Sequence, residues 1–156
     1  MTAPAIGKAI KNFSLPATSG QAIKLSSLKG KKNVVLYFYP KDSTPGCTTE
    51  GQDFRDHYSD FVQADTVILG VSRDSIKSHE NFKAKQDFPF ELLSDQDVIL
   101  CQQFDVIKEK NMYGKKYMGI ERSTFLIDKQ GKLVQEWRKV KVKGHVEEVL
   151  AAVRAL

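Results

Sequence analysis

Residues 34–47 read VVLYFYPKDSTPGC, and this stretch decides the fold. Val34–Tyr39 has the continuous apolar character of a buried strand, and the turn through Pro45 and Gly46 leads into a segment with helical periodicity. A helix that begins here leaves unpaired N–H groups and the positive end of its dipole at its first turn, where Cys47 lies. Such a position favours the thiolate over the thiol, so the sequence predicts a reactive cysteine.

The residues that follow predict a helix that turns this thiol inward. Apolar or small residues recur at steps of four and three and so share one helix face: Cys47, Gly51, Phe54, Tyr58 and Phe61. Thr66–Ser72 predicts a second buried strand, parallel to the first because a right-handed crossover joins them. Reactive groups gather at the carboxyl ends of parallel strands, and Cys47 lies just beyond that end of Val34–Tyr39.

The rest of the chain predicts a hairpin on either side of this unit and three further helices. Before this unit we expect short strands at 13–15 and 23–25, joined around Ser19-Gly20. After it we expect a helix capped by Ser75 that runs to Gln86, and a helix at 98–104 capped by Asp95 or Asp97. A hairpin of strands 123–128 and 133–137 around Gly131 follows, and the last element is an amphipathic helix with the apolar residues Val146, Val149, Leu150 and Val153. This order predicts an α/β thioredoxin-like fold, a central mixed sheet flanked by helices, with an N-terminal hairpin extension and an inserted helix.

Composition sets the class of protein. With 156 residues, 41% of them hydrophobic, and no linker-like segment, we expect a single domain spanning residues 1–156. Residues 1–11 lack the apolar segment of a signal peptide, and no apolar run is long enough to span a bilayer, so we expect a cytoplasmic protein with no membrane contact. The two cysteines and the dispersed His57, His79 and His145 suit neither a disulfide scaffold nor a metal site.

The net charge of +5 comes with clusters of lysines that could bind phosphate groups. Acidic residues are interspersed among these lysines, and no nucleic-acid-binding motif accompanies them. We therefore interpret the lysines as a solvated surface and do not expect nucleic-acid binding.

Two other residues could assist Cys47. Thr44 can point its hydroxyl at the sulfur or at a bound oxygen, although a threonine there also suits an ordinary turn. Arg122 precedes the strand Ser123–Asp128, and its guanidinium could reach the thiolate if that strand neighbours Val34–Tyr39. The alternative for Arg122 is a surface salt bridge with Glu121 or Glu50.

These segments resemble the peroxiredoxins. The likeness lies in Pro40-x-x-x-Thr44-x-x-Cys47, the extension Thr48-Thr49-Glu50, the segment 113–122 (YGKKYMGIER), the strand 123–128 (STFLID) and the opening 13–16 (FSLP). Within the family, the chain is most similar to the bacterioferritin comigratory protein, or peroxiredoxin Q, subgroup.

The resemblance implies thiol-dependent reduction of hydrogen peroxide and organic hydroperoxides, in antioxidant defence and redox homeostasis. It implies that Cys47 is the peroxidatic cysteine, that Thr44 and Arg122 activate it and polarise the peroxide, and that Pro40 shields the pocket from water. Glu50 would orient Arg122. The chemistry passes through a cysteine sulfenic acid and requires no flavin, haem or metal cofactor.

The chain departs from the subgroup where many members carry a resolving cysteine, because that position is Gln52 here. The remaining thiol, Cys101, is either a resolving cysteine or a buried, inert side chain that fills a packing position. In the second case an external thiol resolves the sulfenic acid, and the reductant is thioredoxin, glutaredoxin or a low-molecular-weight thiol. The absence of an obvious extra interface favours a monomer.

Two other functions fit parts of the sequence. A thiol-disulfide oxidoreductase of the same fold needs a second thiol nearby, but the residue three after Cys47 is Glu50. A non-catalytic basic binding module would use the lysines and leave Thr44, Cys47 and Arg122 without a joint purpose. Both alternatives are therefore weaker than a peroxidase.

Overall fold

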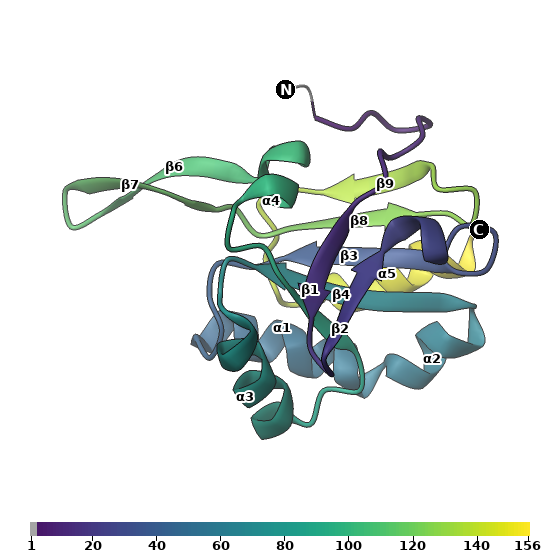
Figure 1. Cartoon of the computed structure of the whole chain (residues 1–156), viewed down its shortest axis with the longest axis horizontal. Helices are drawn as coiled ribbons and strands as arrows, with labels where there is room; N and C mark the ends of the chain where they lie inside the picture. The colour runs from purple at the N-terminus through teal and green to yellow at the C-terminus, as the bar shows by residue number, and fades with distance from the viewer. Residues whose placement is uncertain (1–2) are drawn as a thin grey trace.

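The computed structural model describes residues 3–156 and consists of a twisted mixed sheet with helices on both faces (Figure 1). The sheet has seven strands in the order β2-β1-β5-β4-β3-β8-β9, and two further strands, β6 and β7, form a separate ribbon. The strands are β1 Ser14–Ala17, β2 Gln21–Lys24, β3 Asn33–Phe38, β4 Thr66–Ser72, β5 Glu91–Ser94, β6 Ile107–Met112, β7 Lys115–Ile120, β8 Ser123–Ile127 and β9 Leu133–Trp137. The helices are η1 Leu25–Ser27, α1 Pro45–Asp56, α2 Tyr58–Gln63, α3 Ile76–Gln86, α4 Ile99–Gln103 and α5 His145–Arg154.

The centre of the sheet is formed by three parallel strands. β3 pairs in parallel with β4, and β4 with β5, while β8 runs antiparallel to β3 on its other side. The predicted parallel pair is thus confirmed, and so is the mixed sheet flanked by helices. The N-terminal hairpin joins the same sheet because β1 pairs with β5 at Ala17 and Leu93.

Alternating side chains of β3, and of Tyr39 directly after it, pack into two separate cores. Val35, Tyr37 and Tyr39 face a core built with α1, α2, α3 and α5, which also contains Cys47. Val34, Leu36 and Phe38 face a core on the other side of the sheet, which contains α4 and Cys101. Because successive side chains of a strand point to opposite faces, the sheet separates the two cysteines.

Several predicted elements differ from the structure in their limits. The single helix expected from Cys47 to Phe61 is two helices, because the chain leaves helical geometry at His57, whose φ and ψ are −104° and 9°. The helix expected at 98–104 is shorter, since Val98 adopts a positive φ of 62°. Its N-terminus is capped by Asp95, whose carboxylate accepts from the N–H groups of Leu100 and Cys101, and not by Asp97.

Two features were not predicted. β5 is a strand of only four residues that directly follows Phe88-Pro89-Phe90. β6 and β7 form a lysine-rich ribbon that projects from the body of the protein (Figure 1). Neither face of most of this ribbon is buried, so the sequence lacks the apolar alternation that indicates a half-buried strand.

Among the residues that the structure describes, no helix has the length and apolar character needed to cross a membrane.

Candidate active site

Cys47 lies in the first turn of α1, at the carboxyl end of β3, and its residue is only 2% exposed. Thr44 occupies the N-cap position of the helix, and Pro45 follows it. Pro suits this position because its missing N–H would have no helical partner and its fixed φ is already helical. The sequence therefore starts the helix where the thiol faces both the core and the N-terminal end of the helix dipole.

Arg122 reaches Cys47 from the neighbouring strand. It directly precedes β8, whose Ser123 pairs with Phe38 at the end of β3. Its Nη2 donates to Cys47 Sγ at 3.3 Å, and its Nη1 donates to Glu50 Oε1 at 2.6 Å. One guanidinium thus holds a sulfur and a carboxylate that lie one helical turn apart on α1.

The close approach of Arg122 depends on a glycine before the cysteine. A Cβ atom at Gly46 would lie 3.1 Å from Arg122 Nη2, which is tighter than an ordinary van der Waals contact. Gly46 therefore leaves the guanidinium room to lie across the first turn of the helix.

Glu50 is fully buried, and one of its carboxyl oxygens has no hydrogen-bond partner among the described residues. Burial raises the pKa of Glu50 to about 7, although Arg122 acts in the opposite direction. For Arg122, burial alone would lower the pKa, but Glu50 and then Cys47 raise it overall. The guanidinium therefore stays charged, and it contacts both Glu50 and Cys47.

Thr44 and Pro40 lie in the loop between β3 and α1, and both are half-buried. Thr44 Oγ1 donates to the carbonyl oxygen of Lys41 at 2.8 Å. Within residues 3–156, no hydrogen bond joins this hydroxyl to Cys47. Thr44 therefore makes the ordinary turn contact that was the alternative to a contact with the sulfur. Its oxygen keeps lone pairs that can accept a hydrogen bond from a bound peroxide.

Cys101 lies far from this arrangement. It is buried in α4 within the core on the opposite face of the sheet, and its residue is 0% exposed. Burial and then the charge of Asp95 hold the pKa of the Cys101 thiol well above its ordinary value. The structure therefore does not bring Cys101 together with Cys47.

Three residues beside the site were not identified from the sequence. The buried Tyr37 stacks on Phe54 with ring centroids 4.6 Å apart, and its hydroxyl has no hydrogen-bond partner among the described residues. His145 Nε2 lies 2.8 Å from Thr124 Oγ1, and burial followed by the charge of Arg122 lowers the pKa of His145 to about 4. Lys110, on β6, has a pKa lowered by partial burial and then by Arg122. Each of these residues lies in a regular strand or helix, so no sequence signal marks it. Only the folded structure shows that it lies near the site.

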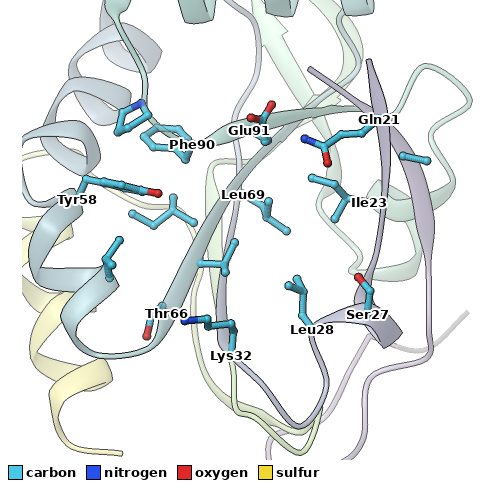
Figure 2. Close-up of a pocket in the computed structure, with 15 residues that line it drawn as sticks. Gln21, Ile23, Ser27, Leu28, Lys32, Tyr58, Thr66, Leu69, Phe90 and Glu91 are labelled. Carbon is cyan, nitrogen blue, oxygen red and sulfur yellow. The ribbon is translucent and has the colours of Figure 1, made fainter. Parts of the chain in front are cut away.

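A pocket of about 440 Å³ lies elsewhere, between the N-terminal hairpin and α2. Figure 2 shows Tyr58 and Phe90 on one side of it and Gln21 and Ile23 of β2 on the other. Neither cysteine lines this pocket, so it does not belong to the thiol site.

Comparison with known proteins shows which family this chain resembles. The AhpC/TSA family matches residues 6–136. Peroxiredoxin Bcp of Xanthomonas campestris pv. campestris is 66% identical over 78% of this chain and 76% of its own length. The solved structure of Xylella fastidiosa PrxQ is 48% identical, with a TM-score of 0.93 over 99% of this chain and 98% of that one.

A third similar protein is the bacterioferritin comigratory protein of Xanthomonas campestris, whose trapped intermediate and ligand complexes concern its alkyl peroxide reduction activity. It is 54% identical, with a TM-score of 0.88, and the match covers 95% of this chain and 98% of that one. These structures confirm the predicted thioredoxin-like fold, and the two alternative functions are not favoured. The chain therefore belongs to the AhpC/TSA family and is a peroxiredoxin, a thiol-dependent peroxidase.

Proposed function

We propose that Cys47 is the peroxidatic cysteine and that it reduces hydrogen peroxide and organic hydroperoxides. The observation that carries this proposal is the 3.3 Å contact between Arg122 Nη2 and Cys47 Sγ at the first turn of α1. A guanidinium and a helix N-terminus both stabilise negative charge on sulfur, and they stabilise the charge that develops on the peroxide oxygens. Pro40 and Thr44 complete the loop over the site, with Thr44 accepting from the peroxide hydroxyl and Pro40 excluding water.

The reduction of the peroxide by Cys47 balances in bonds, electrons and protons. The thiolate attacks one peroxide oxygen, so that an S–O bond forms while the O–O bond breaks. The departing hydroxide or alkoxide takes a proton from water and leaves as water or alcohol. Cys47 is oxidised to a sulfenic acid as the peroxide is reduced.

We propose that an external thiol resolves this sulfenic acid. The thiol displaces water from the sulfenic acid to form a mixed disulfide, and a second thiol then releases Cys47 and leaves as a disulfide. The burial of Cys101 on the other face of the sheet supports this route, because bridging the two cysteines needs their Cα atoms within about 7 Å. Thioredoxin, glutaredoxin or a small thiol can fill the role of reductant.

Steady-state peroxide consumption with dithiothreitol as reductant tests both proposals. The variant Cys47→Ser should lose turnover, and the matched control Cys101→Ser should keep the wild-type rate. Substantial turnover by Cys47→Ser would overturn the role of Cys47. Loss of turnover in Cys101→Ser, with its fold intact by circular dichroism, would overturn external resolution.

We further propose that the protein acts as a monomer in the cytoplasm. The similar bacterial proteins named Bcp and the lack of a membrane-crossing helix among residues 3–156 are consistent with this location. Light scattering coupled to gel filtration tests the oligomeric state, and a mass of about twice 17.6 kDa would contradict a monomer.

A further inference from the structure

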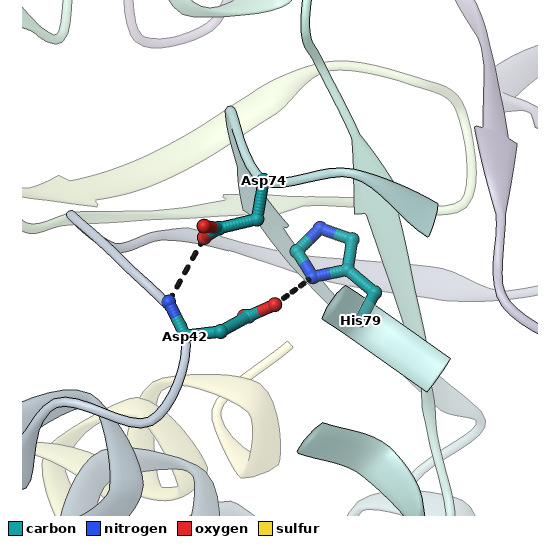
Figure 3. A group of neighbouring side chains, drawn as sticks. All are labelled: Asp42, Asp74 and His79. Carbon is teal, nitrogen blue, oxygen red and sulfur yellow. Dashed lines mark hydrogen bonds and ion pairs between the residues drawn. The ribbon is translucent and has the colours of Figure 1, made fainter. Parts of the chain in front are cut away.

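A buried polar network holds the loop that leads to Cys47, and its centre is Asp42 (Figure 3). The Asp42 carboxylate accepts from the Tyr39 hydroxyl at 2.6 Å and from the Ser78 hydroxyl at 2.8 Å, and it lies 2.7 Å from His79 Nδ1. The backbone N–H of Asp42 donates to Asp74 Oδ2 at 2.9 Å. One loop residue is thereby tied to Tyr39 directly after β3, to α3, and to Asp74 just beyond β4.

Both ring nitrogens of His79 lie within hydrogen-bond distance of an oxygen atom. Nε2 lies 2.9 Å from the carbonyl oxygen of Leu93, which can only accept, and Nδ1 faces the carboxylate of Asp42. Because His79 is 0% exposed and Asp42 only 6%, the contact between them is a buried hydrogen bond.

The same side chains could be taken for a metal site. Asp42, Asp74 and His79 each place one ligand atom within 4.8 Å of the others. A metal ligand, however, needs a free ring lone pair, and both nitrogens of His79 already face hydrogen-bond acceptors. The hydrogen bonds therefore account for the cluster without a cation.

The loop needs such an anchor because its backbone is strained. Ser43, directly after Asp42, has a φ of 65°, a left-handed conformation that non-glycine residues rarely adopt. Strained residues persist where the surrounding contacts fix them. The contacts here are the network at Asp42 on one side and the Thr44 to Lys41 hydrogen bond on the other.

We propose that His79 is a positioning residue for the peroxidase reaction, and that its hydrogen bond with Asp42 holds the loop that sets Thr44 and Cys47 opposite Arg122. This inference rests on the proposed role of Cys47. His79 touches neither the thiol nor the peroxide, so it acts only through the loop. A displacement of about 1 Å at a reacting group can cost about 100-fold in rate, which gives the scale of the expected effect.

Two variants of His79 separate its two hydrogen bonds. In His79→Asn the side-chain amide lies near the place of Nδ1 and can still donate to Asp42. In His79→Gln it lies near the place of Nε2 and can donate to Leu93 but not to Asp42. Both variants replace the ring by an uncharged amide, so each is the matched control of the other.

The readout is the second-order rate constant of Cys47 oxidation by hydrogen peroxide in a single turnover, measured on protein shown by circular dichroism to be folded. We expect His79→Gln to react about 10- to 100-fold more slowly than wild type, and His79→Asn to stay within about threefold of it. Leu133→Ala, a core truncation at the far end of the sheet, should keep the wild-type rate although it is less stable. Equal rates for the two His79 variants would overturn the proposal, because a merely structural residue would not distinguish them.

A measurement on the wild-type protein covers the case in which His79→Gln does not fold. NMR of labelled histidine should show a proton between His79 Nδ1 and Asp42 that exchanges slowly with water, and rapid exchange of this proton would overturn the hydrogen bond. A wild-type protein without any peroxide turnover would overturn the proposed function. Equal rates for the two His79 variants, with turnover by the wild-type protein, would overturn only the role of His79.

Discussion

Replacing Glu50 by glutamine should change how the stability of this peroxiredoxin depends on pH. Burial raises the pKa of Glu50 from an ordinary 4.5 to about 7, even with Arg122 beside it. Between these two values the folded protein holds a proton that the unfolded chain has released. The free energy of unfolding therefore falls as the pH rises through this range, and the loss is complete above the folded-state pKa.

The size of the effect follows from the two pKa values. Each pH unit between them contributes about 1.4 kcal/mol, so ionisation of the buried carboxyl costs about 3 kcal/mol at the alkaline end. In Glu50→Gln the amide oxygen can still accept from Arg122 Nη1, but no carboxyl proton is left to lose. The unfolding free energy of the variant minus that of wild type should grow by about 2–3 kcal/mol between about pH 5 and about pH 8.

The unfolding free energy of the variant must be compared with that of wild type at each pH, because His145 makes stability change with pH in the opposite direction. Burial lowers the pKa of His145 from 6.5 to about 4, so between these values the unfolded chain holds the extra proton. Stability from this group is present above the unfolded-state pKa and is lost as the pH falls. His145 is the same in both proteins, and its contribution cancels.

Urea unfolding, followed by the fluorescence of the single tryptophan, Trp137, measures the difference at each pH. Asp65→Asn is the control, because Lys129 and Lys32 lower the pKa of that exposed carboxyl below its ordinary 3.8, so its difference from wild type should stay constant between about pH 5 and about pH 8. If the difference for Glu50→Gln stays constant or shrinks as the pH rises, Arg122 outweighs burial and the reasoning is refuted.

Three other substitutions test the packing and the charge of the site. Arg122→Lys should lower the rate of peroxide turnover about 100-fold, since one ammonium cannot replace the fork that holds both the carboxylate and Cys47; a wild-type rate in stopped-flow assays would contradict this. Tyr37→Phe should leave the unfolding free energy unchanged or raise it by up to about 1 kcal/mol, because it removes a buried hydroxyl without a partner among the described residues; a clear loss in urea unfolding would show that the hydroxyl is satisfied. Gly51→Ala should cost about 1–3 kcal/mol, because its Cβ would lie 2.3 Å from the Phe88 ring; an unchanged midpoint in the same assay would refute that clash.

The sequence predicts the central strands, the first helix and the final helix well because each has a strong apolar pattern. β3 is buried along its whole length, and α1 carries its buried residues on one face. The exposed ribbon of β6 and β7 and the four-residue β5 lack such patterns, so they were missed. The break at His57 depends on local geometry that spacing does not reveal.

The sequence likewise predicts some features of the site and not others. The position of Cys47 follows from the strand, turn and helix around it, and the approach of Arg122 follows once β8 neighbours β3. The direction of the Thr44 hydroxyl is set by a local hydrogen bond to Lys41. The pairing of Asp42 with His79 joins residues from a loop and from α3, and only the folded chain shows it.

The most direct test of the account is intact-protein mass spectrometry after one equivalent of hydrogen peroxide, with trapping of sulfenic acid and free thiols and mapping of the labelled peptides. We expect a trapped sulfenic acid on Cys47 and a free thiol on Cys101. Consumption of the peroxide with Cys47 left as a free thiol would contradict its peroxidatic role, and a disulfide between Cys47 and Cys101 would contradict resolution by an external thiol.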